Sequence, residues 1–150
     1  MEVLTTIDEV RAVTEATRSA GRTVGLVPTM GALHEGHVSL MDAATGDGCS
    51  LLVTIFVNPL QFAPGEDLSA YPRPLEADLT AAAAAGAAWC FVPVDGEMYL
   101  TKPLTTVSVA RLGDGMEGAS RPTHFAGVAT VVTKLFAIAG ACRAYFGEKD

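Results

Sequence analysis

The sequence predicts an α/β protein, a Rossmann-like three-layer fold with a mainly parallel sheet and helices on both faces. Apolar runs of strand length alternate with segments of helical periodicity along the chain, and right-handed crossovers turn such an order into a parallel sheet. The most apolar run, residues 50–57, shows no alternation, which is typical of a strand covered on both faces. In this architecture ligands bind beyond the carboxyl ends of the strands, so the loops after the strands are expected to carry the chemistry.

The first half of the chain contains two predicted helices and two predicted strands. Thr6 and Glu9 have the spacing of a capping box, and apolar residues follow at helical intervals up to Gly21. A β-rich run over residues 23–27 comes next. A turn with glycines then leads into a helix over residues 34–44, and the apolar strand described above follows it.

The second half begins with a loop over residues 58–73, where three prolines exclude regular structure. A helix over residues 74–85 starts with proline and acids and stops at glycine, and an apolar strand over residues 88–92 follows. The remaining elements are predicted as a strand, a loop, a long amphipathic helix and a last strand over residues 105–109, 113–122, 123–139 and 143–146. The predicted order is therefore α-β-α-β-α-β-β-α-β.

Composition restricts the function. The 150 residues carry 10 Lys plus Arg and 17 Asp plus Glu, a net charge of −7, which argues against a nucleic-acid partner and leaves any anion to a local site. Three scattered cysteines predict neither a disulfide framework nor a zinc site. The chain starts without a basic segment and has no apolar stretch of membrane-spanning length, so we expect a soluble cytoplasmic protein without a membrane partner.

The loop after the strand that Pro28 ends has the residues of an anion site. His34 and His37 lie three residues apart at the start of a helix, so they share a face. Free N–H groups and the positive end of the helix dipole are located there as well. Gly31 and Gly36 would let phosphate approach the backbone. The pattern favours phosphate binding, and a pair of surface histidines or a pair of metal ligands are the alternatives.

Two further loops that follow strands carry polar side chains. Asn58 and Gln61 lie among aromatic and aliphatic residues, which suits a small polar organic substrate, although Asn-Pro is also a common turn opening. Lys149 and Asp150 follow the last predicted strand. One interpretation is that they bind phosphate and magnesium, and the other is a frayed terminus.

Together these segments resemble the pantoate–β-alanine ligase family. The segments that specify it most closely are Phe-Val-Asn-Pro-Leu-Gln-Phe at 56–62 and Phe-Gly-Glu-Lys-Asp at 146–150. The His-x-Gly-His element alone indicates only the wider nucleotidyltransferase superfamily. The matching stretches occur in the family's order and cover roughly half of the chain, at residues 27–40, 54–73, 118–136 and 144–150.

The resemblance implies an ATP- and magnesium-dependent ligation in two steps. The pantoate carboxylate would attack the α-phosphorus of ATP to give pantoyl adenylate and pyrophosphate. The amine of β-alanine would then displace AMP and form the amide bond of pantothenate, a precursor of coenzyme A. The alternatives are another nucleotidyltransferase, or a non-catalytic module for nucleotide binding or dimerisation.

The resemblance also implies roles for individual residues. His34, His37 and Lys149 would be catalytic, because they would stabilise charge that develops on the ATP phosphates. The implied ATP-binding residues are Met30, His34, Gly36, His37, Gly147, Lys149 and Asp150, the last also a magnesium ligand. The implied pantoate residues are Pro28, Met30 and Gln61. The implied residues of the acceptor and phosphate side are Asn58, Tyr71, Glu117 and Arg121, although the last two by themselves indicate only a surface ion pair.

The resemblance further implies that residues 1–150 are a nucleotide-binding (adenylylation) domain, and that the family's smaller C-terminal domain is not among them. We therefore expect these residues alone to bind nucleotide weakly and to turn over little or no substrate. A homodimer formed through this domain is the expected assembly.

Overall fold

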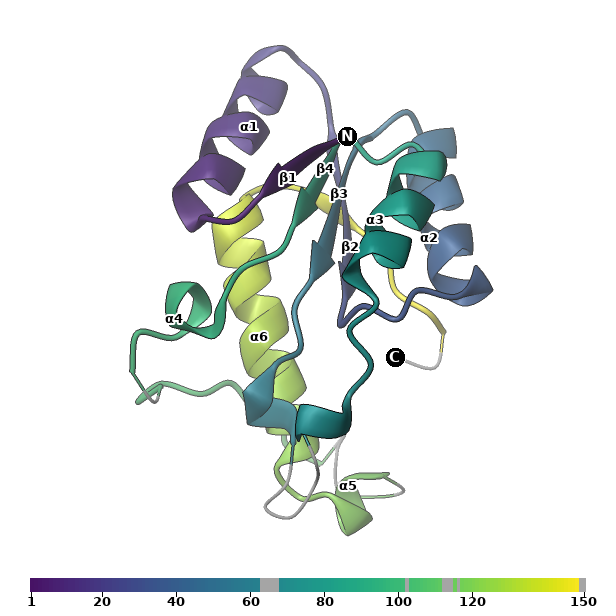
Figure 1. Cartoon of the computed structure of the whole chain (residues 1–150). Helices are drawn as coiled ribbons and strands as arrows, with labels where there is room; N and C mark the ends of the chain where they lie inside the picture. Colours follow the sequence, from purple (N-terminus) through teal and green to yellow (C-terminus); the bar gives the residue numbers. More distant parts are fainter. Residues whose placement is uncertain (63–67, 102, 112–114, 116, 149–150) are drawn as a thin grey trace.

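The computed structural model of the chain describes residues 1–62, 68–101, 103–111, 115 and 117–148. One five-stranded sheet forms its centre, with the strand order β1-β4-β3-β2-β5 and every neighbouring pair parallel (Figure 1). The strands are β1 (Glu2–Leu4), β2 (Val24–Thr29), β3 (Ser50–Ile55), β4 (Trp89–Phe91) and β5 (Arg143–Ala144). The predicted parallel α/β sheet is confirmed.

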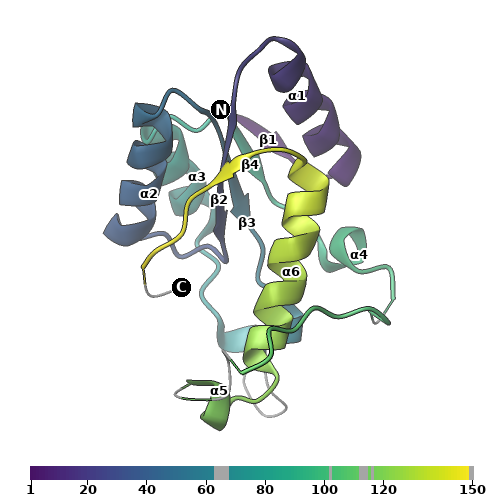
Figure 2. The same ribbon diagram turned by 180° about the vertical axis from the view of Figure 1, so that it is seen from behind.

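Helices cover both faces of this sheet. One face packs against α1 (Ile7–Ser19) and α6 (His124–Ala139), and the other against α2 (Glu35–Gly46) and α3 (Leu75–Ala84), as Figures 1 and 2 show from opposite sides. The short elements at the ends of strands and in loops are η1 (Pro59–Gln61), η2 (Leu68–Ala70), α4 (Asp95–Met98) and α5 (Glu117–Ser120). The three-layer arrangement that the sequence predicts is therefore present.

The central strand β3 explains why its sequence shows no alternation. Leu52 packs into the apolar core beneath α1 and α6, whereas Leu51 and Val53 pack into the second core beneath α2 and α3. All three side chains are buried. Because both faces of the strand are covered, both sets of side chains have to be apolar.

The strand order places a topological switch at β2. From β2 the chain adds β3 and then β4 on one side, and it later adds β5 on the other. The crossover helix α2, which follows β2, and the crossover helix α6, which precedes β5, pack on opposite faces of the sheet. Ligands of parallel α/β proteins bind at such a switch point, beyond the carboxyl edge of the sheet. The N-terminus of α2 lies at this edge of the sheet (Figure 1).

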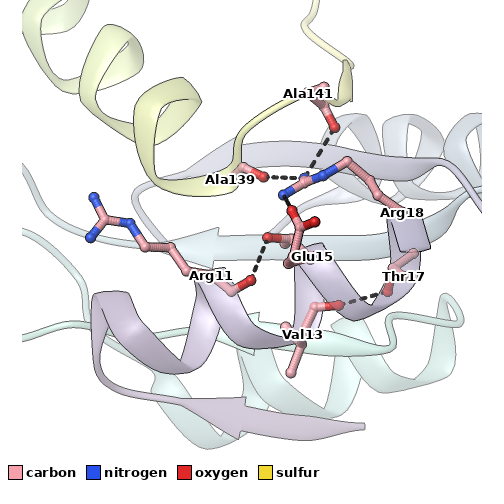
Figure 3. Close-up of polar contacts among 8 residues, drawn as sticks. Arg11, Val13, Glu15, Thr17, Arg18, Ala139 and Ala141 are labelled. Carbon is pink, nitrogen blue, oxygen red and sulfur yellow. Dashed lines mark hydrogen bonds and ion pairs between the residues drawn. The ribbon is translucent and has the colours of Figure 1, made fainter. Parts of the chain in front are cut away.

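The end of α6 is tied to α1 by one arginine (Figure 3). The guanidinium group of Arg18 donates hydrogen bonds to the carbonyl oxygens of Ala139, at 2.7 Å, and Ala141, at 3.3 Å. Between them Gly140 has a φ of +70° and ends the helix. The arginine thus satisfies carbonyl groups that the helix end leaves unpaired, and it fixes the turn that leads into β5.

The short helices η1 and η2 lie within the predicted loop over residues 58–73, and two further elements, β1 and α4, lie outside every predicted element and loop. Residues 2–4 form β1 because they pair with β4, with Val3 opposite Cys90, and Leu4 is buried. Three residues are too few to show periodicity. The four-residue helix α4 begins after Val94 without a side-chain cap, so it has no local start signal either.

Two predictions for the second half are wrong. Residues 105–109 are not a strand: the N–H of Val107 donates instead to the Thr130 hydroxyl on α6, at 2.9 Å. The predicted loop over residues 113–122 contains the short helix α5. Only Val107 of this segment is half-buried, against α6, whereas Thr105 and Val109 are exposed, so the alternation does not mark a covered strand face.

The cysteines agree with the prediction that no disulfide is formed. Cys49 and Cys90 are buried, Cys142 is half-buried, and all three are free thiols. Burial, with a smaller contribution from the charge of Asp78, raises the pKa of the Cys90 thiol to about 12. Cys90 is therefore an unreactive part of the core.

We predict that Gly127→Ala will destabilise the fold, because α6 meets η1 at this residue. An added Cβ would lie 2.6 Å from the Leu60 carbonyl carbon and 2.7 Å from the Gln61 Cα. Backbone atoms cannot move aside cheaply, so the free energy of unfolding should fall by about 1–3 kcal/mol. Gly46→Ala is the matched control, since its Cβ would meet open space in α2. Urea unfolding of both variants checks this, and equal stability of the two would contradict the packing.

Candidate active site

The loop after β2 adopts a backbone conformation that another helix holds in place. Gly31 and Ala32 both have positive φ values, +86° and +51°. The Asp78 carboxylate on α3 accepts hydrogen bonds from the N–H groups of Ala32, at 2.9 Å, and Leu33, at 2.8 Å. A Cβ on Gly31 would lie 2.9 Å from the Asp78 Oδ2, so the close approach requires glycine. Asp78, which is 3 % exposed, thereby fixes the loop that leads to the histidines.

His34 and His37 form the N-terminal cap of α2. The His34 Nδ1 accepts the N–H of Gly36, at 3.1 Å, and the His37 Nδ1 accepts the N–H of His34, at 3.3 Å. The two ring centroids are 4.0 Å apart. Because each Nδ1 is an acceptor, each neutral ring carries its proton on Nε2. The predicted placement of the two histidines, on one face at a helix N-terminus, is thus confirmed, and their role toward phosphate stays a prediction.

Gly36 is part of this cap. A Cβ at this position would lie 2.9 Å from the Cε1 and 3.0 Å from the Nδ1 of His34. The imidazole of His34 lies over the backbone here, and only glycine leaves it room. Approach of phosphate to Gly36 stays a prediction, whereas its contact with the His34 ring is present in the structure.

The loop after β3 places two amide side chains at the same edge of the sheet. Asn58 is 1 % and Gln61 7 % exposed. The Asn58 Nδ2 donates to the Gln61 Oε1, at 3.2 Å, and the Gln61 Nε2 lies 2.7 Å from the Met30 sulfur. Two of the predicted pantoate residues, Met30 and Gln61, are therefore in contact, and the third, Pro28, lies two residues before Met30 on β2.

The start of α6 approaches the backbone of the same loop. The Gln61 carbonyl oxygen accepts a hydrogen bond from the Arg121 guanidinium, at 3.3 Å, and lies 3.0 Å from the His124 Nδ1. Arg121 is thus near the predicted site, but it holds the loop through this carbonyl. His124 was not predicted, because nothing in its sequence surroundings marks it.

Tyr71 forms an aromatic wall. Its ring packs edge-on against Phe62, with 6.0 Å between the ring centroids. Burial, with a smaller contribution from the charge of Asp78, raises the pKa of the Tyr71 hydroxyl. The hydroxyl is therefore protonated at neutral pH and can donate a hydrogen bond.

A cavity of about 510 Å³ opens beside these residues, at the ends of β3 and β4. Its lining includes Met30, Phe56, Arg73, Asp78, Val92 and Asp95. This volume is suitable for a small organic molecule. Met30 lines both this cavity and the contact with Gln61, so the cavity continues the predicted substrate side of the site.

The segment after β5 emerges at the same edge. β5 pairs with β2, and the Tyr145 N–H donates to the Leu26 carbonyl oxygen, at 2.9 Å. Gly147 follows three residues after the strand. Lys149 and Asp150 lie outside the described residues, as does the side chain of Glu117 at the start of α5. Their implied roles stay predictions.

Within the part of the chain that the structure describes, no three His, Cys, Asp or Glu side chains are grouped to hold a metal ion. Both oxygens of Asp78 already accept backbone N–H groups. Mg²⁺ commonly binds proteins through one or two carboxylates together with substrate phosphates. The described residues therefore offer no preformed magnesium cage.

Comparison with known proteins assigns this fold and these loops to one family. The family model for pantoate-beta-alanine ligase matches residues 2–150. The pantothenate synthetase of Mycolicibacterium smegmatis is 59 % identical over 143 residues, which are 95 % of this chain and 46 % of that protein. The pantothenate synthetase of Corynebacterium jeikeium is 56 % identical over 150 residues, 99 % of this chain and 49 % of that protein. The chain spans about half the length of these curated relatives.

Solved structures of pantothenate synthetases have the same fold as this chain. The crystal structure of pantothenate synthetase from Thermus thermophilus superposes with a TM-score of 0.90 at 44 % identity and covers 99 % of this chain and 52 % of that one. Pantoate-beta-alanine ligase from Francisella tularensis, complexed with beta-gamma ATP and beta-alanine, gives a TM-score of 0.86 at 34 % identity, over 93 % of this chain and 53 % of that one.

We predict that Asp78→Ala will destabilise the loop after β2. Two partly buried N–H groups would lose their acceptor, which should lower the free energy of unfolding by about 2–4 kcal/mol. The amide protons of Ala32 and Leu33 should also exchange faster with solvent. Glu76→Ala removes an exposed acid from the same helix end and should change stability by no more than about 0.5 kcal/mol. Urea unfolding measures the stability of both variants, and hydrogen exchange measures the protection of the two amide protons. Unchanged exchange rates at Ala32 and Leu33 would contradict the proposal that Asp78 holds this loop.

Proposed function

Because the chain belongs to the pantoate–β-alanine ligase family, we propose that it is the nucleotide-binding domain of an ATP-dependent ligase that joins pantoate to β-alanine. The observation that carries the proposal most directly is the histidine cap of α2. The two imidazole rings lie 4.0 Å apart at the N-terminus of α2, in the loop that follows β2, and their Nδ1 atoms are occupied by backbone N–H groups. This supports an anion site that uses the Nε2 donors and the helix N-terminus. The ligase in complex with ATP and β-alanine supports the same substrates.

In the first step we propose that the pantoate carboxylate attacks the α-phosphorus of ATP. A new oxygen–phosphorus bond forms, the bond between the α-phosphorus and the bridging oxygen breaks, and pyrophosphate leaves with that electron pair. Negative charge grows on the phosphoryl oxygens as the bond exchange proceeds. His34 and His37 donate from Nε2 to these oxygens, which is a form of transition-state stabilisation that needs no protein nucleophile. Lys149 is proposed to act on the same phosphates.

In the second step the neutral amine of β-alanine attacks the acyl carbon of pantoyl adenylate. The amide bond forms, AMP leaves with the electron pair of the acyl–oxygen bond, and the amine loses a proton to solvent. The adenylate must be kept from water until the amine arrives. Tyr71 with Phe62 forms an aromatic wall that suits this purpose, and Arg121 is proposed to lie on the acceptor and phosphate side.

Pantoate is proposed to bind against Pro28, Met30 and Gln61, with Gln61 as its hydrogen-bond partner. Asn58 is proposed to act through Gln61, because its amide group is buried and bonded to that residue. The nucleotide is proposed to contact Met30 and the histidine cap, and further contacts are proposed for Gly36, Gly147 and Asp150. Glu117 is proposed to lie on the acceptor and phosphate side. Mg²⁺ is proposed to arrive with the ATP phosphates and to meet Asp150.

A homodimer is proposed for the assembly. Leu100 and Leu104 are 93 % and 100 % exposed beside an apolar groove of about 550 Å³ between the α4 end and α6. Covering such side chains with a second copy would gain about 25 cal/mol for each Å² of apolar surface. No described helix has the length and apolarity needed to cross a membrane. We propose a cytoplasmic location, with no nucleic-acid or membrane partner.

The test of the function is ATP–pyrophosphate exchange with and without D-pantoate. We expect ATP to raise the melting temperature of this chain slightly and the chain alone to exchange little. The protein extended by the second half that its curated relatives possess should show exchange that depends on pantoate. Exchange with a different acid would instead indicate another nucleotidyltransferase. ATP-induced stabilisation with no exchange in the extended protein would indicate a binding module.

We predict that His37→Ala will lower the rate of adenylation more than tenfold in the extended protein. His37→Asn is the sharper variant, because its Oδ1 can still accept the His34 N–H while the Nε2 donor is gone. It should keep the melting temperature of the wild type and lose the rate as His37→Ala does. Wild-type exchange in either variant would disprove the phosphate role.

A further inference from the structure

Tyr99 is a polar residue at the site that the proposed chemistry does not use. It follows α4, and its hydroxyl lies 3.0 Å from the Asn58 Oδ1. Its ring is held on two sides, by Phe56 at 6.0 Å between ring centroids and by the Lys134 ammonium group 5.3 Å from the ring centroid. Burial raises the pKa of the hydroxyl to about 12, so the proton needed for donation is present at neutral pH.

The orientation of the Asn58 amide follows from two backbone groups. A backbone N–H can only donate, and a carbonyl oxygen can only accept. The N–H of Leu60 lies 3.3 Å from one end of the amide, which must therefore be Oδ1. The carbonyl of Gly127 lies 3.1 Å from the other end, which must therefore be Nδ2. The two ends cannot be exchanged without placing donor against donor and acceptor against acceptor.

The orientation of the Asn58 amide determines the orientation of the Gln61 amide. The Tyr99 hydroxyl faces the Asn58 Oδ1 and has to donate to it, since that oxygen is an acceptor. The Asn58 Nδ2 has a second proton, which it donates to the Gln61 Oε1, at 3.2 Å. With its oxygen occupied, Gln61 turns its NH₂ group toward the Met30 sulfur. A donor is therefore presented on the substrate side.

We propose that Tyr99 is a positioning residue that acts through Asn58 to hold the Gln61 amide with its NH₂ group toward the substrate side, and that this makes the site selective for a ligand with oxygen acceptors at this point. The proposal rests on the proposed function, in which that ligand is pantoate, whose carboxylate and hydroxyl oxygens accept hydrogen bonds. An acceptor in place of the Gln61 NH₂ would oppose such a ligand by repulsion between lone pairs.

Tyr99 matters because the other bond that holds the Asn58 oxygen is long. Without the hydroxyl, Oδ1 retains the Leu60 N–H at 3.3 Å. Asn58 is 1 % exposed, so bulk water does not replace the lost donor without a rearrangement. The Gly127 carbonyl still holds the Asn58 Nδ2, at 3.1 Å, so the amide is not exchanged end for end but tilts about its remaining bonds. The Gln61 NH₂ group then spends less time facing the substrate side, and ligand affinity falls with that fraction.

The experiment compares Tyr99→Phe with Tyr145→Phe in this chain. The control removes the same hydroxyl from a residue whose partner is Asp47, at 2.8 Å, at the far end of α2. NMR measures the nuclear Overhauser effect between the side-chain NH₂ protons of Gln61 and the Met30 methyl group, and a titration with D-pantoate measures the Kd. Thermal melting confirms that both variants are folded.

We expect the Overhauser effect in the wild type and the control, and a clear weakening of it in Tyr99→Phe. The Kd for D-pantoate should rise about five- to tenfold in Tyr99→Phe and stay within about twofold in the control. An unchanged Overhauser effect and Kd in Tyr99→Phe would overturn the positioning role. If the wild type fails to bind D-pantoate while the Overhauser effect still depends on Tyr99, the positioning role is supported and the proposed substrate is wrong.

Discussion

The parallel register between β2 and β3 is the constraint on which the rest of the site depends. Six residues pair in sequence, so that Thr29 lies opposite Ile55 and both strands end at the same height. The loops that follow therefore start side by side, although 25 or more residues separate them along the chain. This common edge brings Met30 within reach of Gln61. A shift of one residue would also exchange the faces of every side chain in a strand that is buried on both sides.

Beyond that edge, side chains of the site are themselves held by backbone groups. Asp78 accepts two N–H groups of the loop after β2, and His34 and His37 each accept one within the cap of α2. Asn58 contacts a backbone N–H at one end and a carbonyl at the other. Each histidine thus uses its Nδ1 to fix the orientation of the ring, whereas Asn58 is fixed at both ends of its amide. Such preorganisation matters for catalysis, because donors that are already oriented need not reorganise when charge develops.

The sequence was sufficient to predict structural features whose signal lies within a few neighbouring residues. The capping box of Thr6 and Glu9, the proline and acids that begin α3 and the glycine that ends α6 depend on neighbours within a few residues, and the structure contains all three features. The positions of His34 and His37 were predictable for the same reason, because their spacing of three residues places both side chains on one face of the helix that they begin. The Asn58 and Gln61 loop was placed by motif resemblance rather than by local physics.

Long-range partners could not be predicted in this way. Asp78 lies 46 residues from Ala32, and Tyr99 lies 41 residues from Asn58. An acid near the start of a helix looks like an ordinary helix-dipole residue, and a tyrosine after a short unpredicted helix has no pattern at all. Residues 105–109 show the opposite error. Their alternation was interpreted as pairing in the sheet, but Val107 bonds to the side chain of Thr130 on α6.

The net charge of −7 and the proposed anionic ligand are compatible because most of the donors proposed at this edge, other than Lys149 and Arg121, are neutral. A ring whose Nδ1 accepts a hydrogen bond is the uncharged imidazole, and the Gln61 amide and the backbone N–H groups carry no formal charge. Such donors act over hydrogen-bond distance and add little to the long-range field, which salt screens beyond about 8–10 Å. The interaction with phosphate that is proposed for them would strengthen as negative charge accumulates during bond exchange. A site of this kind favours the transition state more than it favours the bound nucleotide, and this difference is what raises a rate.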